Sequence, residues 1–113
     1  MNDIERKRVE NAVAKFVAKR RPPVHLRDKV DLAFHFDGRS VEIFEIRPAW
    51  QHRKETMEHP VAKATFVRSK NRWRIFWMRR DLKWHGYEPN LEVQSLKAFL
   101  NVVDRDEYCC FFG

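Results

Sequence analysis

The sequence lacks a long hydrophobic segment. None of its apolar runs approaches the roughly 20 residues that a membrane-spanning helix needs. The N-terminus, MNDIERKRVE, carries charges from the start, which excludes a secretory signal peptide. We therefore expect a cytoplasmic protein that makes no contact with a membrane.

Cysteine is scarce as well, and the two cysteines, Cys109 and Cys110, are adjacent. Adjacent side chains in an extended segment point apart, so we expect reduced thiols rather than a disulfide, as is usual in the cytosol. Adjacent thiols also lack the two-residue spacer that lets a pair reach one zinc ion. His52 and His59 are separated by six residues and His85 lies farther along, so the histidines form no ligand motif. The sequence predicts neither a metal site nor a cofactor.

Charge is abundant instead, and it is unevenly spread. Of the 113 residues, 43% are apolar and 35% are charged, which is typical of a folded protein, and we predict a single domain over 1–113. The net charge is +7. Residues 1–29 hold nine cations against four anions and residues 60–88 hold eight against two, whereas 30–59 and 89–113 are slightly acidic. Because basic charge favours polyanionic partners, these two basic segments are candidate binding regions.

Helical periodicity marks both ends of the chain. Apolar residues recur at helical spacing up to a Pro22-Pro23 pair, which predicts an N-terminal helix within 1–21. Ser95 is a suitable N-cap for a second helix over 95–105, whose apolar residues repeat at the same spacing. The C-terminal tail, YCCFFG, is too apolar to be left in water, so we expect it to pack against the rest of the fold.

The segment between the helices alternates apolar and polar residues, as strands with one buried face do. We predict an antiparallel sheet of four or five strands over 29–89, with WHGYEP as the short fifth strand. Residues 47–60 show no sustained period and contain proline near both ends, which predicts a long loop. Trp50 and Met57 are expected to anchor this loop.

Turn residues set the expected register of the strands. Asp37-Gly38 is a favoured dipeptide of two-residue hairpin turns, and Asn71 tolerates the left-handed backbone that a turn at 69–72 needs. The expected pairs are Phe36 with Arg39, Phe34 with Val41, Phe66 with Ile75 and Ala64 with Trp77. The fold class is therefore α+β, with an N-terminal helix, an antiparallel sheet and a C-terminal helix, and with both helices mainly on one face of the sheet.

Several short motifs resemble a known family. RPAW, VAKATFV, RWRIFWMRRDLKWHGYEP and CCFFG, in this order over about residues 30–113, are similar to small bacterial proteins grouped as a domain of unknown function. The elements W-x-x-Y-E-P and F-F-G are the most distinctive. The resemblance implies a complete domain of bacterial type and implies no activity, so function has to be argued from the residues.

The basic, aromatic stretch RIFWMRRDLKWHGYEP predicts a nucleic-acid-binding surface. Phosphates need cations, and unpaired bases need flat side chains on which to stack, at roughly 1–3 kcal/mol per base. The expected binding residues are Arg74, Phe76, Arg79, Arg80, Lys83, Trp84 and Tyr87, with Lys63 beside them and the basic face of the first helix as a second contact. The competing interpretation is structural, because strand aromatics are mostly core and strand-end arginines often pair with carboxylates. No motif of a known nucleic-acid-binding module is present.

A second hypothesis is catalytic. If both hairpins lie in one sheet, Asp31, His35 and Glu42 share a face with Lys63, and such a set could hold a divalent metal or carry out acid–base chemistry, as in nucleases. Nothing in the spacing demands an enzyme, since cross-strand pairs of opposite charge commonly cover a solvated sheet face.

A third hypothesis is a protein partner. A sheet face that exposes Phe44, Phe76 and Met78 among charges could pair with a second copy about a two-fold axis, forming a homodimer. This hypothesis accounts for the aromatic residues but not for the excess of arginine. We therefore favour a small binding module with nucleic acid as its ligand.

Overall fold

The computed structural model describes residues 1–52 and 54–112 and confirms the α+β fold class. Within these ranges, no helix is long and apolar enough to cross a membrane. In chain order the elements are α1 (Asp3–Arg20), the 3-10 helix η1 (Val24–Leu26), β1 (Asp31–Phe36), β2 (Ser40–Pro48), β3 (Thr56–Val67), β4 (Arg72–Met78), β5 (Trp84–Gly86), the 3-10 helix η2 (Glu88–Asn90), β6 (Glu92–Val93) and α2 (Leu96–Arg105).

The strands form one antiparallel sheet in the order β1-β2-β3-β4-β5, and β6 also pairs with β4. The fifth strand expected in WHGYEP is confirmed as β5. Strand β6 was not predicted, because a two-residue strand is too short to show alternation. Ile75 of β4 lies between these two segments: its N–H donates to the carbonyl of Leu91 (3.0 Å), and its carbonyl accepts from the N–H of Tyr87 (2.9 Å).

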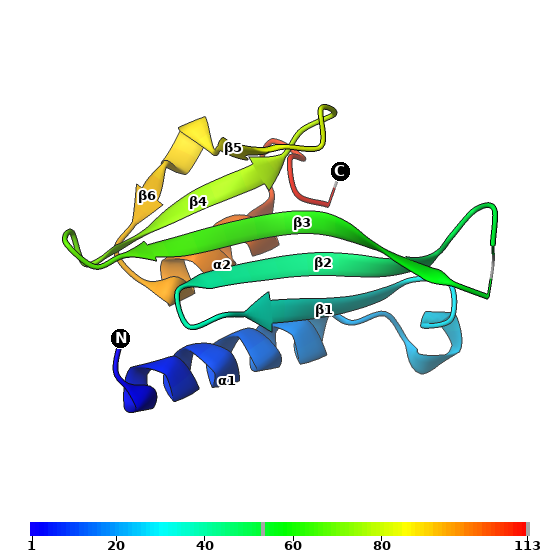
Figure 1. The fold of residues 1–113 in the computed structure, drawn as a ribbon, viewed down its shortest axis with the longest axis horizontal. Coiled ribbons are helices and arrows are strands. Elements are labelled where there is room, and N and C mark those ends of the chain that lie inside the picture. The colour runs from blue at the N-terminus through cyan, green and yellow to red at the C-terminus, as the bar shows by residue number, and fades with distance from the viewer. Residues whose placement is uncertain (53, 113) are drawn as a thin grey trace.

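Both helices pack on one face of the sheet, as predicted. In Figure 1, α2 passes behind the strands and α1 runs along the β1 side. One buried cluster joins the two helices to that face, and its members include Val9, Val13 and Val17 of α1, Leu32, Val41, Ile43, Ala64, Trp73 and Ile75 of the sheet, and Phe99, Leu100 and Val103 of α2. Among residues 1–52 and 54–112, no helix lies on the opposite face, and we call it the open face.

Side-chain caps begin both helices. Asn2 accepts a hydrogen bond from the N–H of Glu5 (2.8 Å), and the Ser95 hydroxyl accepts one from the N–H of Ala98 (3.1 Å). These bonds satisfy backbone donors that have no partner inside the helix. The helix boundaries predicted from the sequence are correct to within two residues.

The C-terminal tail packs on the helix side of the sheet, as predicted. The carboxylate of Asp106 accepts hydrogen bonds from the N–H groups of Phe111 (3.0 Å) and Phe112 (2.9 Å), which turns the tail back toward the core. The ring of Phe111 lies 4.8 Å from that of Tyr87, and Phe112 lies beneath an arginine of α1. The last residue of the predicted tail, Gly113, lies outside the described residues.

The register predicted for the first hairpin is wrong by two residues. Gly38 and Arg39 are the central residues of the turn, and Gly38 has φ of +94°, which is a conformation that favours glycine. Asp37 stays outside the turn centre, where its carboxylate accepts from the N–H groups of Arg39 (2.9 Å) and Ser40 (2.7 Å). A shift of two residues leaves every side chain on its predicted face. The observed pairs include Phe36 with Val41, His35 with Glu42 and Phe34 with Ile43.

The second hairpin is also shifted by two residues from its predicted register. Its turn spans 68–71, one residue earlier than expected, and Asn71 has the expected left-handed backbone with φ of 51°. When a turn moves by one residue, each strand residue pairs with a partner two positions away. Every side chain therefore stays on its predicted face of the sheet. The observed pairs include Phe66 with Trp73, Ala64 with Ile75, Lys63 with Phe76 and Ala62 with Trp77.

Half of the loop predicted over 47–60 is strand. Strands β2 and β3 stay paired as far as Pro48 with Thr56, past Ile46, the last residue of β2 that pairs with β1, and we call the part outward from the Glu45–His59 pair the arm (Figure 1). Trp50 is 85% exposed and Met57 is 49% exposed, so neither anchors the chain. A ribbon with no buried face needs no alternation, which is why the sequence pattern failed here. One residue of the predicted loop, Arg53, lies outside the described residues.

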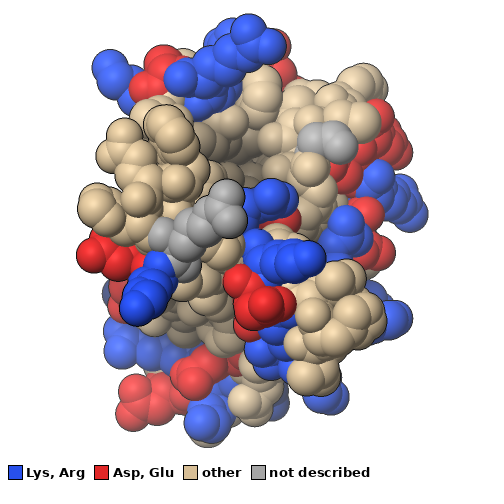
Figure 2. All heavy atoms as spheres, turned by 90° about the vertical axis from the view of Figure 1, so that its right-hand side faces the viewer, with Lys and Arg blue, Asp and Glu red and all other residues tan. Residues whose placement is uncertain are grey.

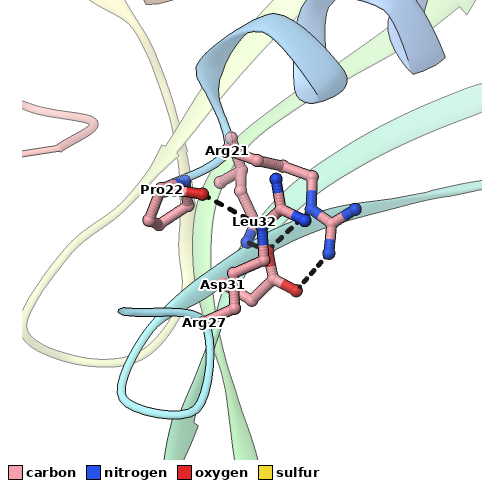
Figure 3. Close-up of polar contacts among 5 residues, drawn as sticks. All are labelled: Arg21, Pro22, Arg27, Asp31 and Leu32. Atoms are coloured by element: carbon pink, nitrogen blue, oxygen red, sulfur yellow. Dashed lines mark hydrogen bonds and ion pairs between the residues drawn. The ribbon is translucent and has the colours of Figure 1, made fainter. Parts of the chain in front are cut away.

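A bidentate ion pair joins the end of α1 to the start of β1 (Figure 3). Arg21 donates from Nε to Oδ1 of Asp31 (2.9 Å) and from Nη2 to Oδ2 (2.7 Å). The N–H of Leu32 donates to the same Oδ1 (2.8 Å), and Arg27 Nε donates to the carbonyl of Pro22 (3.0 Å). The hydrogen bonds from Arg21 hold the pKa of Asp31 below its ordinary value.

Candidate functional site

The open face brings together basic, aromatic and hydroxyl side chains from four neighbouring strands. Alternation along each strand places them on the side away from the helices. The residues are Ser40 and Glu42 of β2, Lys63 and Thr65 of β3, Arg74, Phe76 and Met78 of β4, and Trp84 of β5. Three of the predicted binding residues, Arg74, Phe76 and Trp84, are therefore brought together with Lys63.

Cations lie beside the aromatic rings of this face. Lys63 Nζ is 5.8 Å from the ring centroid of Trp84, and Arg74 Cζ is 5.5 Å from that of Phe76. Both distances are within the range in which a cation is attracted to a ring. On β5, Gly86 is the partner of Phe76 and adds no side chain there, so β5 does not cover Phe76 at this pair.

The remaining polar contacts on the open face leave part of its basic charge available. The hydroxyls of Ser40 and Thr65 share a hydrogen bond of 2.9 Å. Glu42 Oε1 lies 3.8 Å from Lys63 Nζ, which is a long ion pair. Arg74 is exposed and has no carboxylate at ion-pair distance within the described ranges. Its cross-strand partner on β6 is Glu92, whose carboxylate accepts a hydrogen bond from Lys70 Nζ (3.3 Å), so Arg74 can still contact an anion.

A second basic group lies on the turn between β4 and β5. Arg79, Arg80 and Lys83 are all exposed there. Asp81 is the acidic residue of this turn, and both of its oxygens are engaged: Oδ2 accepts from His85 Nε2 (2.8 Å) and Oδ1 from the N–H of Lys83 (3.0 Å). The bond from His85, followed by that from Lys83, holds the pKa of Asp81 below its ordinary value. The turn is thus locally fixed and carries an excess of positive charge.

The chain of this turn has an unusual backbone. Leu82 has φ of 61° although it is not glycine, and its side chain is 79% exposed. A bulky residue in the left-handed region is uncommon and costs free energy, so the surrounding bonds have to hold it. One of them runs from the N–H of Leu82 to the carbonyl of Arg79 (2.9 Å).

Two hollows adjoin the turn and share Trp77 and Arg79 in their walls. One, of about 460 Å³, is lined by Trp77, Met78, Arg79, Arg80 and Asp81. The other, of about 500 Å³, extends from Trp77 and Arg79 past His85 to Cys110. Figure 2 faces the end of the molecule at which the arm lies, and the surface there is hollowed below a group of basic and acidic side chains.

Trp77 was not predicted to line a site. It packs against the core cluster but is only half-buried, and Arg79 Cζ lies 5.6 Å from its ring centroid. The spacing of Trp77 and Arg79 could have indicated this contact, because residues two apart on a strand lie on the same face. A tryptophan followed two residues later by an arginine therefore predicts this contact.

The prediction that Tyr87 lies on the binding surface is wrong. Tyr87 is 2% exposed and packs against Phe111, and burial raises the pKa of its hydroxyl. It follows β5 directly, and the bond from its N–H to Ile75 holds the chain so that its side chain joins the core cluster.

The basic face of α1 does not extend the open face, and its role as a second contact stays a prediction. Helix α1 packs on the other side of the sheet. At its C-terminal end, Arg20 donates to the Asp104 carboxylate at 2.6 Å and Arg21 is bound by Asp31. A ligand lying flat on the open face therefore cannot reach these two arginines.

Of the residues of the catalytic hypothesis, His35, Glu42 and Lys63 are cross-strand neighbours, and Asp31 lies apart from them at the other end of β1. Asp31 is bound by Arg21, and Glu42 faces Lys63. His35 donates instead to Glu58 (3.3 Å). The part of the chain that the structure describes contains no group of three His, Cys, Asp or Glu side chains that could hold a metal ion.

The apolar residues of the dimer hypothesis are only partly exposed. Phe44 is 5% exposed because His35 stacks on it, with ring centroids 4.4 Å apart. Phe76 and Met78 are half-buried.

Cys109 and Cys110 are free thiols away from the open face, and burial raises the pKa of Cys110.

A family model described as "Domain of unknown function (DUF3024)" matches residues 1–113. The chain belongs to the DUF3024 family. The resemblance drawn from the motifs over about 30–113 is thereby confirmed, and the match also includes α1. No curated protein and no solved structure matches the chain. For this DUF3024 chain, a function therefore has to be proposed from the geometry of the open face and of the β4–β5 turn.

Proposed function

We propose that the open face binds single-stranded nucleic acid. Phe76 and Trp84, on neighbouring strands, are the rings on which bases stack, and Lys63 and Arg74 contact phosphates. The observation that supports this proposal is the pairing of a cation with each ring, at 5.8 Å and 5.5 Å, on a sheet face without a helix.

The interleaving of rings and cations favours a single strand over a duplex. Unpaired bases can stack on aromatic side chains, which contributes about 1–3 kcal/mol per base. In a duplex the bases are already stacked on one another, so only the cations would contribute. Ser40 and Thr65 provide hydroxyls beside Arg74, and such groups also bond phosphate and sugar oxygens.

The test is a titration of a labelled oligonucleotide, single-stranded and as a duplex, at several salt concentrations. We expect the single strand to bind more tightly and its affinity to fall as salt is raised, because bound phosphates release counterions. Replacing Trp84 by alanine should weaken single-strand binding by roughly 5- to 150-fold, the equivalent of one lost stacking contact.

Trp50→Ala is the matched control, because Trp50 is an exposed tryptophan in the loop that joins β2 to β3, outside the strands that carry the open face. It should change the affinity less than about twofold, as expected of a side chain outside the contact. Three results would contradict the proposal: no binding at low salt, equal or tighter binding of the duplex, or equal losses in the Trp84 and Trp50 variants.

A further inference from the structure

The β4–β5 turn has the features of an anion-binding site that is separate from the stacking rings. Its three cations, Arg79, Arg80 and Lys83, are exposed, and the carboxylate of Asp81 is already engaged by His85 and by a backbone N–H. No carboxylate lies at ion-pair distance from Arg79 or Arg80 among residues 1–52 and 54–112. The positive charge of the turn therefore exceeds its negative charge.

Trp77 orients one of these arginines. Arg79 Cζ lies 5.6 Å from the ring centroid of Trp77. A guanidinium held against a ring uses its flat face and leaves its N–H groups at the edge free for two parallel hydrogen bonds to a phosphate. Arg80 lines the same hollow of about 460 Å³, so two arginines can reach one bound group. Asp81 also lines it, but its two oxygens already accept hydrogen bonds from His85 and from the N–H of Lys83.

This hollow adjoins the proposed nucleic-acid surface. Met78, one of its lining residues, is the cross-strand partner of Trp84 and lies on the open face. Trp77, the next lining residue, lies on the helix side. The hollow therefore lies across the end of β4. A nucleic-acid strand with a base stacked on Trp84 can continue into it.

We propose that the hollow binds the terminal phosphate of the nucleic-acid strand, so that the protein recognises a strand end. The inference rests on the proposed function. A terminal phosphate monoester carries about −1.5 to −2 charge at neutral pH, more than the single charge of an internal phosphodiester, so it gains more from two arginines. The sugar and base of the end nucleotide would contact Trp77 and Met78.

The first experiment compares oligonucleotides of one sequence with a 5′-phosphate, a 3′-phosphate or no terminal phosphate. We expect one phosphorylated form to bind at least about tenfold more tightly than the unphosphorylated form. This ratio corresponds to the free energy of one hydrogen bond to a charged group. Arg79→Gln should remove this preference and leave the affinity for the unphosphorylated strand within about twofold, because the stacking rings remain.

Arg68→Gln is the matched control, because Arg68 is an exposed arginine on the β3–β4 turn at the other end of β4. It should keep the preference for a phosphorylated end. Equal binding of all three oligonucleotides would overturn the inference, as would a preference that survives Arg79→Gln. Circular dichroism of both variants would establish that they are folded.

The second experiment separates this inference from the proposed function. A nucleoside monophosphate and inorganic phosphate are titrated into the protein, and the NMR signals of the Arg79 and Trp77 side chains are followed. Shifts that Arg79→Gln abolishes support a phosphate monoester site even if no oligonucleotide binds, in which case the ligand is a free mononucleotide. If neither compound shifts these signals and no terminal phosphate is preferred, the inference is wrong, whether or not the open face binds a strand.

Discussion

At the scale of single residues, the same side chain takes different roles according to its neighbours. Arg20 and Arg21 are bound by Asp104 and Asp31, and they connect α1 to the rest of the fold. Arg74 and Arg79 lie beside aromatic rings, and neither has a carboxylate at ion-pair distance among the described residues. Only the second pair is free to bind an anionic ligand, so the arginine content of a segment is a poor measure of its binding capacity.

The Arg21–Asp31 pair predicts a pH-dependent stability. The folded-state pKa of Asp31 is lowered, so its contribution is present above the ordinary aspartate value of about 4 and is lost as the pH falls through the folded-state value. Asp31→Asn should therefore lower the free energy of unfolding at neutral pH, and the difference from the unmodified protein should disappear in strong acid. Denaturant unfolding at a series of pH values measures this.

The control for this experiment is Asp28→Asn, because Asp28 is exposed and has no ion-pair partner in the described part of the chain. We expect it to leave the free energy of unfolding nearly unchanged at neutral pH. If the Asp31 and Asp28 variants behave alike, or if the Asp31 difference persists in strong acid, the pair does not stabilise the fold.

At the scale of elements, the sheet is divided into a part that packs and a part that does not. Between the turns and the Glu45–His59 pair, one face of β2 and β3 joins the core. Beyond that pair the arm has no covering helix, and it carries the most exposed tryptophan described, Trp50. The stability of the sheet should therefore depend on the packed part and on the helices that cover it.

The Ser95 cap provides a test of this dependence. Ser95→Ala removes the hydroxyl that bonds the N–H of Ala98 and should lower the free energy of unfolding by about 1 kcal/mol. Ser69→Ala, an exposed serine on the β3–β4 turn, is the control and should change it by less than about 0.5 kcal/mol. Equal losses in denaturant unfolding would mean that the cap does not hold α2 in place.

At the scale of the whole molecule, both helices and the tail cover one face of the sheet and leave the other to solvent. This one-sided arrangement makes the open face accessible to a flat ligand. It also raises the question of a second copy, which could cover the same face.

We expect the protein to be a monomer at the concentrations used for binding. Phe44 is buried under His35, so the open face offers too little contiguous apolar surface for a stable dimer. Sedimentation velocity measures this directly. A dimer that Phe76→Ser dissociates would show that the open face is a self-association surface instead.

The sequence by itself determined the features that depend on local signals. Helix periodicity and the Ser95 cap act within a few residues, so the two helices were predicted to within two residues of their ends. Alternation assigned strand residues to their faces, and a register error of two residues could not change that assignment. Arg74 and Phe76 were therefore assigned to the same face correctly.

Only the tertiary structure decided which of those residues have partners. Tyr87 is buried in the core, and Asp31 is bound by Arg21, ten residues before it in the chain. The arm and the hollow beside Trp77 depend on how far strands pair and where the helices stop covering them. These properties arise from contacts between segments distant in the chain, which no local pattern of residues specifies.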